Sequence, residues 1–224
     1  MNFQFKVKLG ELNTQSIVLL GALVALGVVL GIIAAQKKKW TARMLSHGAV
    51  CIALSFVLSY IRLLKMPQGG SVTAVSMLPV MAFSYLYGVG PGLLVGICYG
   101  LLQLVQNPEI LGLAQVLLDY PLAFGCLGLA GLGRKLIPGD KNGNGWKDYL
   151  RWALGTFLAA LGRYLCSALS GLVFFAEYAA GSGYSPLVYT LLYNGVILVE
   201  WGLCLVVLIP PTLRKNLEKM AKGK

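Results

Sequence analysis

The stretch VLLDYPLAF, residues 116–124, places a single acid among apolar residues that are suited to a membrane interior. An ionised carboxylate at the centre of a membrane span costs about 2.5–3.5 kcal/mol on insertion scales, so it normally faces a cavity or a partner. Two interpretations of Asp119 stay open: an ion pair between helices, with Arg163 as the candidate partner, or a counter-charge for a cationic ligand. Pro121 frees a backbone carbonyl and predicts a local kink of the kind found beside cavities.

The sequence on both sides of this stretch is typical of an integral membrane protein. Of the 224 residues, 57% are hydrophobic and 12% are charged, whereas a soluble domain carries roughly 25% charged residues. About 20 consecutive apolar residues cross the hydrocarbon core of a bilayer, and glycine- and proline-rich turns separate such segments here. We therefore predict seven membrane spans, at 16–35, 44–64, 72–88, 91–106, 111–133, 150–176 and 185–211.

The formal net charge of +11 indicates membrane orientation rather than nucleic-acid binding. Nucleic-acid binding needs a water-exposed basic face, whereas the cytoplasmic loops of membrane proteins are rich in Lys and Arg. Fourteen of the nineteen Lys and Arg fall in the 36–43 loop, the 134–151 loop and the tail after Leu213. These three segments lie on one side if every predicted span crosses the membrane. We expect a multi-pass protein of the plasma membrane with a cytoplasmic C-terminus.

The last two spans carry polar and aromatic side chains. Arg163, Ser167 and Gly171 are spaced four residues apart, which places them on one face of a helix. This pattern fits either close helix packing, with Ser and Gly as small contacts, or a site lined with hydrogen-bond donors. Tyr189 lies near the predicted outer interface, where tyrosine also occurs as a headgroup anchor. Asn194 lies deeper and is harder to explain as an anchor.

The residue types present exclude several kinds of chemistry. His47 is the only histidine and lies at a predicted helix start beside basic residues, so a His-based metal or catalytic site is excluded. The five cysteines fall within apolar segments without metal-ligand spacing, and we interpret them as small buried hydrophobes. Glu200 is a second acid within a span, and its neighbours in the sequence indicate no role. The sequence contains no Walker motif, so ATP-driven transport would require partner chains.

Three blocks of sequence, in order along the chain, carry a resemblance to a known family. They are MPQGGSV at 66–72, VLLDYPLAF at 116–124 and RYLCSALSGLVFFAEYA at 163–179, and a segment from Tyr189 to Asn194 follows the third block. With these blocks the chain resembles the thiamine-specific S-component of energy-coupling factor (ECF) vitamin transporters.

The resemblance implies an all-α integral membrane protein with a six-helix S-component core. It covers most of the chain, and we place the substrate-binding membrane domain at 44–213. Residues 1–43 then form one extra N-terminal transmembrane helix and a basic cytoplasmic loop, and residues 214–224 form a basic cytoplasmic tail. The extra helix is expected to pack at the periphery of the core.

The resemblance also implies an outward-opening pocket and no catalytic activity or cofactor. Asp119 and Tyr120 match the acid–Tyr pair that lines the thiamine site of the family. The other residues expected in the substrate site are Ser167, Gly171, Phe175, Tyr189, Asn194, Gln68, Gly70 and Arg163. The family usually has His where this chain has Ser167, and often Trp where it has Phe175. These replacements would weaken thiamine binding or shift selectivity to a related pyrimidine or thiazole compound.

The expected partners follow from the same resemblance. Ala49 and Ala53 match the surface that docks onto the shared transmembrane coupling subunit, and two ATPases complete the complex. Thiamine carries a permanent thiazolium cation and a flat aminopyrimidine, which a carboxylate and aromatic faces suit, with cation–π attraction worth about 0.5–2 kcal/mol. The alternatives are the same fold with a thiamine precursor or another small vitamin and, more distantly, a membrane enzyme. Enzymes cluster their reactive groups, whereas the acids here are far apart in sequence.

Overall fold

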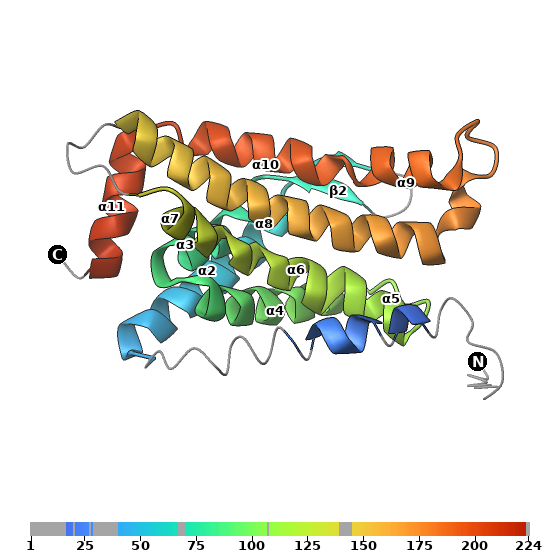
Figure 1. Cartoon of the computed structure of the whole chain (residues 1–224), viewed down its shortest axis with the longest axis horizontal. Coiled ribbons are helices and arrows are strands. Elements are labelled where there is room, and N and C mark those ends of the chain that lie inside the picture. The colour runs from blue at the N-terminus through green and yellow to red at the C-terminus, as the bar shows by residue number, and fades with distance from the viewer. Residues whose placement is uncertain are drawn as a thin grey trace.

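The computed structural model describes residues 17–19, 21–26, 28, 40–66, 70–106, 108–138 and 145–222. Its helices run mostly side by side along one long axis and form an elongated bundle (Figure 1). In chain order they are α2 (Ala42–Tyr60), α3 (Leu78–Tyr87), α4 (Val89–Gln106), α5 (Leu113–Leu117), η1 (Leu118–Leu122), α6 (Ala123–Gly125), η2 (Cys126–Leu132), α7 (Gly133–Leu136), α8 (Gly145–Phe174), η3 (Ala176–Ala179), α9 (Pro186–Asn194), α10 (Val196–Val207) and α11 (Pro211–Lys222).

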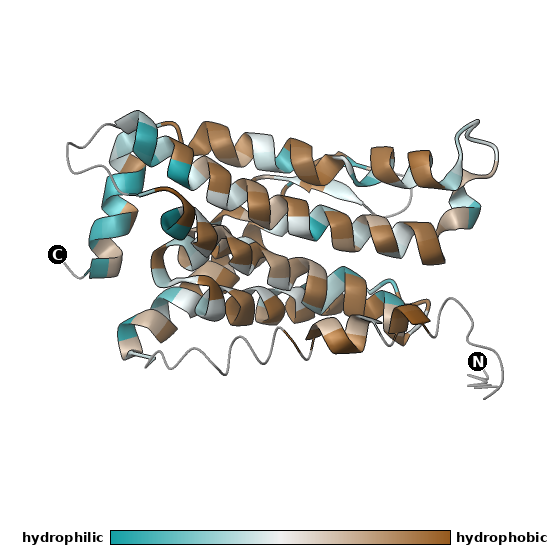
Figure 2. Cartoon of the chain, viewed as in Figure 1, coloured by the Kyte–Doolittle hydropathy of each residue, from teal (hydrophilic) through white to brown (hydrophobic). Residues whose placement is uncertain are grey.

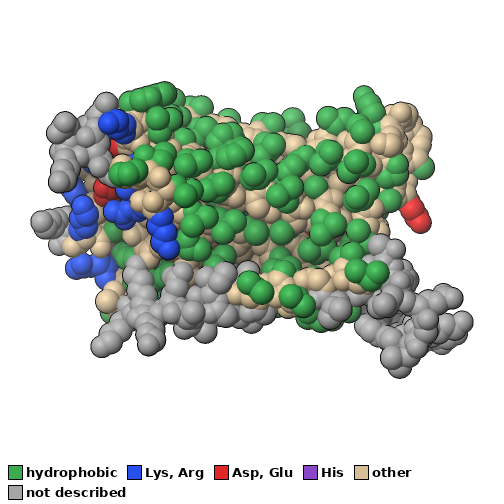
Figure 3. All heavy atoms as spheres, in the orientation of Figure 1, with side chains coloured by type: hydrophobic (Ala, Val, Ile, Leu, Met, Phe, Trp, Pro, Cys, Tyr) green, Lys and Arg blue, Asp and Glu red, His purple; other side chains and the backbone are tan. Residues whose placement is uncertain are grey.

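The described part of the chain has the surface of an integral membrane protein. Hydrophobic residues run along the sides of the bundle (Figure 2), and Lys and Arg gather at the end that carries α11 (Figure 3). Side chains such as Val50 and Val199 are about 60% exposed, which suits lipid rather than water. The predicted membrane class is therefore confirmed. Among the described residues, five helices are long and apolar enough to cross a bilayer: Ala42–Tyr60, Val89–Gln106, Leu113–Leu136, Gly145–Phe174 and Pro186–Val207.

A β-hairpin corrects two of the predicted spans. The predicted span 44–64 ends as a helix at Tyr60, and two antiparallel strands follow, β1 (Arg62–Lys65) and β2 (Ser71–Thr73). The predicted span 72–88 begins in this hairpin, so its helix is only the ten-residue α3. At 1.5 Å per residue α3 covers about 15 Å, half of a bilayer core of about 30 Å. Hydropathy missed the hairpin because its strands have only four and three residues, and their apolar side chains merge with the neighbouring apolar segments.

Glycines let α4 approach the next helical run closely. Gly92, Gly96 and Gly100 are spaced four residues apart, so they share one face of α4. A Cβ atom at Gly96 would collide with the carbonyl of Phe124, and one at Gly100 would lie 2.5 Å from the carbonyl oxygen of Tyr120. Small residues at such positions allow backbones to pack tightly inside a membrane. The contact fixes α4 against the run that carries Asp119.

Two further helices, one near each end of the chain, pack against the bundle. A short apolar helix, Ile17–Leu26, lies at the edge of the bundle beside α5 (Figure 1). Apart from Val28, the rest of the predicted span 16–35 lies outside the described residues. The division into 1–43, 44–213 and 214–224 stays a prediction. At the other end α11 lies across the bundle. Buried Arg214 holds it there by an ion pair with Asp148, at 2.9 Å between Nε and Oδ2.

Candidate functional site

Asp119 lies on a π-helical turn, η1, within the membrane-spanning run Leu113–Leu136. Single π-helical turns are frequent at functional sites, and Pro121 within this one has no N–H to donate. The irregularity predicted from Pro121 thus takes the form of a π-helix. Oδ2 of Asp119 accepts hydrogen bonds from Gln115 Nε2 at 2.7 Å and from Ser170 Oγ at 2.8 Å. Donors from two helices therefore fix the carboxylate.

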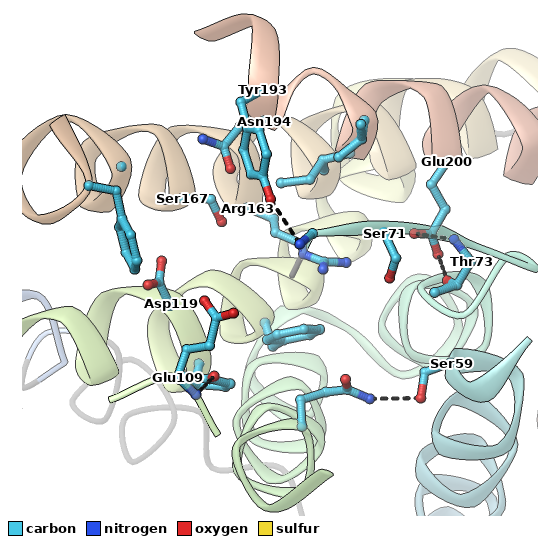
Figure 4. Close-up of a pocket in the computed structure, with 18 of the residues that line it drawn as sticks. Ser59, Ser71, Thr73, Glu109, Asp119, Arg163, Ser167, Tyr193, Asn194 and Glu200 are labelled. Carbon is cyan, nitrogen blue, oxygen red and sulfur yellow. Dashed lines mark hydrogen bonds between the residues drawn. The ribbon is translucent and has the colours of Figure 1, made fainter. Parts of the chain in front are cut away.

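The site is a cavity of about 230 Å³ bounded by the hairpin, α4, the α5–η1 run, α8 and the α9–α10 helices. Figure 4 shows Asp119, Arg163, Ser167 and Asn194 arranged around this space. Its walls combine charged groups with several aromatic rings, as ligand cavities do when a few polar groups orient a largely apolar ligand. The acids are Glu109, Asp119 and Glu200, the cations Arg62 and Arg163, and the aromatic residues Tyr99, Tyr120, Phe124, Phe175, Tyr178, Tyr189 and Tyr193.

The end of the hairpin turn contacts α9 across the cavity. The backbone N–H of Gly70 donates a hydrogen bond to Tyr193 Oη at 2.9 Å. A Cβ atom on Gly70 would lie 2.7 Å from the same oxygen, so a side chain here would displace the tyrosine. The N–H of Met66 donates to the Gly70 carbonyl at 2.7 Å and closes the turn. Gln68, predicted for the site, lies outside the described residues.

Arg163 reaches the cavity from α8 but forms no ion pair with Asp119. Its guanidinium carbon lies 4.2 Å from the centre of the Phe124 ring, a cation–π geometry. The buried Nε and Nη1 atoms have no hydrogen-bond partner in the part of the chain that the structure describes. Within the described ranges the only ion pair joins Arg214 and Asp148. Of the two interpretations of Asp119, the ion pair with Arg163 is therefore wrong, and the carboxylate has no protein counter-charge among these residues.

Glu200, which had no predicted role, connects α10 to the hairpin and to the start of α3. Its Oε1 accepts hydrogen bonds from Thr73 Oγ1 at 2.7 Å, from Ser76 Oγ at 3.0 Å and from the Met77 N–H at 3.3 Å. The side chain is 2% exposed. A carboxylate at the N-terminus of a helix is stabilised by the unpaired N–H groups there. These partners lie more than 120 residues away from Glu200 in the chain. The residues next to Glu200 in the sequence therefore could not indicate its role.

Glu109 is a second acid of the site that the sequence did not reveal. It lies in the loop between α4 and α5 and lines the cavity. Its backbone N–H donates to Tyr120 Oη at 3.0 Å, which ties the loop to the site helix. Burial raises the pKa of the Glu109 carboxyl above its ordinary value. From the sequence, an acid in a polar loop that contains proline is expected to be exposed to water. The fold instead places Glu109 at the cavity.

The structure brings most of the predicted substrate residues to one place. Nine of the ten line the cavity: Asp119, Tyr120, Ser167, Gly171, Phe175, Tyr189, Asn194, Gly70 and Arg163. Their role in binding stays a prediction. The sequence missed Ser170, which bonds Asp119 directly, and Tyr193, whose hydroxyl meets Gly70; both lie close to predicted residues on the same helices.

The two predicted docking residues lie outside the cavity, on the surface of the bundle. Ala49 and Ala53 are exposed on α2, one turn apart. Large apolar side chains surround them, with Val50, Leu54 and Val57 each about half exposed or more. This face is flat and apolar, which suits close contact with another membrane helix.

The fold and the cavity define a class of protein: a polytopic membrane protein that encloses a small-molecule cavity among its helices. Comparison with known families is consistent with this class. The family model described as "Thiamine transporter protein (Thia_YuaJ)" matches residues 45–221. The chain belongs to this thiamine transporter family. The membership confirms the resemblance seen in the sequence, and the role of the family is transport rather than catalysis.

Individual relatives agree with this assignment. A "Thiamine transporter ThiT" of Bacillus subtilis (strain 168) is 33% identical over 68% of this chain and 83% of its own length. A "Thiamine transporter ThiT" of Lacticaseibacillus paracasei is 27% identical over 66% of this chain and 75% of its own length. A solved structure of ThiT from Listeria monocytogenes superposes with a TM-score of 0.68 at 22% identity, covering 80% of this chain and 96% of that one. At 22% identity, this structural similarity shows a shared fold.

Proposed function

We propose that this chain binds thiamine or a close analogue in the cavity, as the substrate-binding subunit of an ECF-type importer. One observation carries the proposal: Asp119 faces the cavity, held by Gln115 and Ser170, and no described Lys or Arg neutralises it. A carboxylate at membrane depth needs a compensating charge. The thiazolium of thiamine is a permanent cation and supplies one.

The remaining walls suit the rest of the ligand. Tyr189 and Tyr193 stack on each other with ring centres 6.1 Å apart, and Phe175 lines the same cavity. Flat heteroaromatic rings bind such surfaces by stacking and cation–π contact. Asn194 and Ser167 offer hydrogen bonds to a pyrimidine edge. Ser167 and Phe175 stand where the family usually has His and often Trp, so a smaller thiamine precursor is the alternative ligand.

The charge distribution supports an outward-facing cavity. The described Lys and Arg of α7, of α11 and of the first turns of α8 gather at one end of the bundle (Figure 3), and the hairpin turn and the loop before α5 line the cavity from the other end. Basic ends of membrane proteins face the cytoplasm. The C-terminus then lies inside, and the cavity opens outside, where an imported vitamin is collected.

Delivery of the ligand would use partner chains. The exposed apolar face around Ala49 and Ala53 on α2 is the surface we assign to the transmembrane coupling subunit. The sequence has no phosphate-binding loop of the Walker type, so the two ATPases of the coupling module would supply the energy.

Isothermal titration calorimetry of the purified full chain tests the proposal. None of the described tryptophans lines the cavity, so heat is a better readout than tryptophan quenching. We expect thiamine to bind with a submicromolar Kd, more tightly than its hydroxymethylpyrimidine precursor, and riboflavin not to bind. Asp119→Asn should abolish most of the heat, while Glu177→Gln, an exposed acid outside the cavity, should bind like the unmodified protein. No binding of thiamine, or tighter binding of the precursor, would overturn the assignment.

A further inference from the structure

The N-terminal helix, Ile17–Leu26, precedes the part of the chain that matches the family, residues 45–221. Its described side chains divide sharply between two faces. Ala22 is 3% exposed, whereas Ile17 and Val24 are 55% and 59% exposed. Val18, Ala22 and Leu26 are spaced four residues apart and form the packed face. The helix therefore docks on the bundle by one defined stripe.

This stripe contacts the helix that carries Asp119. Ala22 forms a buried cluster with Leu118 and Leu122, the first and last residues of the π-helical turn η1. Asp119 lies directly after Leu118. Phe174 and Cys166 of α8 pack against the same cluster, so the N-terminal helix contacts η1 at the place where η1 meets α8.

The helices η1 and α8 both contribute to one hydrogen bond of the site. Ser170 of α8 donates to Asp119 of η1 at 2.8 Å, and this bond depends on the spacing between the two helices. The π-helical turn contains Pro121, which cannot donate an N–H. At membrane depth such irregular backbone is tolerated where protein rather than lipid covers it. The N-terminal helix provides that cover on the side away from the cavity.

We propose that the N-terminal helix is a built-in brace of the binding site and that Ala22 is a positioning residue for Asp119. The assignment rests on the proposed thiamine binding. The helix holds η1 against α8, which keeps the Ser170–Asp119 hydrogen bond and the carboxylate in place for the cation of the ligand. Only a small side chain at position 22 allows this contact, because Ala22 is enclosed by Leu118 and Leu122.

Substitutions in the full chain test the brace. Ala22→Phe should weaken thiamine binding about tenfold, the effect of losing one hydrogen bond to a charged group, chiefly through faster dissociation. Ala22→Ser should bind like the unmodified protein. Val24→Phe, the same type of change on the exposed face of the helix, is the matched control and should have no effect.

A double-mutant cycle separates positioning from general stability. Since Ala22 acts through the Ser170–Asp119 bond, Ala22→Phe should cause little further loss of affinity in a Ser170→Ala background. Additive losses, or equal losses from Ala22→Phe and Val24→Phe, would overturn the assignment.

If Ala22→Phe is not expressed, a disulfide crosslink tests the same contact. Ala22→Cys combined with Leu118→Cys, in a full chain whose native cysteines are replaced because Cys166 packs against the same cluster, should form an intramolecular disulfide with a mild thiol oxidant, without loss of thiamine affinity. No crosslink would overturn the contact. Absence of thiamine binding by the unmodified protein would overturn the proposed function together with the brace, whereas normal binding by Ala22→Phe would overturn the brace alone.

Discussion

At the scale of single residues, the two membrane acids have different tasks. Asp119 has two donors and faces the cavity, whereas Oε1 of Glu200 accepts hydrogen bonds from three donors of the hairpin and the start of α3. Glu200 also lines the cavity, but its donors already compensate much of its charge. We therefore assign Glu200 to structure and Asp119 to the ligand.

Replacement of Glu200 tests this division. In Glu200→Gln the amide oxygen can replace Oε1, but the NH2 then faces the Thr73 N–H that pointed at Oε2, and the bonds to a charged acceptor become bonds to a neutral one. The change should therefore destabilise the protein by about 1 kcal/mol. Thermal unfolding of the ligand-free protein measures this. The control is Glu177→Gln, which should leave the Tm unchanged because Glu177 is exposed. An unchanged Tm for Glu200→Gln would contradict the structural role.

At the scale of elements, the contact between α4 and the site helix determines where Tyr120 lies. Gly100→Val would place a Cβ atom 2.5 Å from the Tyr120 carbonyl oxygen. Overpacking of this kind costs about 1–3 kcal/mol, and the backbone shift should also weaken thiamine binding. Gly202→Val on α10 is the control, since a Cβ there meets no atom within 4 Å. Calorimetry and thermal unfolding of both variants check the prediction, and equal behaviour of the two would contradict it.

The attachment of the C-terminal helix α11 depends on Arg214. Arg214 donates to the carbonyl of Ile209 at 2.7 Å and to that of Gly145 at 2.9 Å, besides its ion pair with Asp148. Arg214→Ala removes these bonds at once, so α11 should detach and its amides should exchange with deuterium much faster. Lys219→Ala, an exposed change on the same helix, should not alter exchange. Slow exchange in Arg214→Ala would show that apolar packing alone holds α11.

Some of these features could be predicted from the sequence and others could not, for physical reasons. Long apolar spans and an acid at membrane depth have large local costs, so the membrane class and Asp119 are visible in the residues themselves. The hairpin is not, since its strands have only four and three residues and lie directly beside apolar segments. Glu109, Glu200 and Ser170 obtain their roles from residues far away in the chain, so sequence spacing could not reveal them. Pro121 indicated an irregular turn but not a π-helix.

At the scale of the whole molecule, the basic end of the bundle predicts the membrane orientation. In a protein without its native cysteines, Lys219→Cys on α11 should react with a membrane-impermeant thiol reagent only after the cells are opened. Ser182→Cys, in the loop between η3 and α9, should react in intact cells. Labelling of residue 219 from outside would reverse the proposed orientation and place the cavity on the cytoplasmic side.

The cation of the ligand distinguishes a site in which Asp119 is the counter-charge from one in which it is not. Calorimetry with thiamine and with a neutral isostere, in which carbon replaces the thiazolium nitrogen, tests this role on the unmodified protein and on Asp119→Asn. Breaking a buried charge pair costs about 2 kcal/mol or more, so the unmodified protein should prefer thiamine by at least about thirtyfold. Asp119→Asn should lose that preference. An equal preference for thiamine in both proteins would contradict the role of Asp119 as the counter-charge.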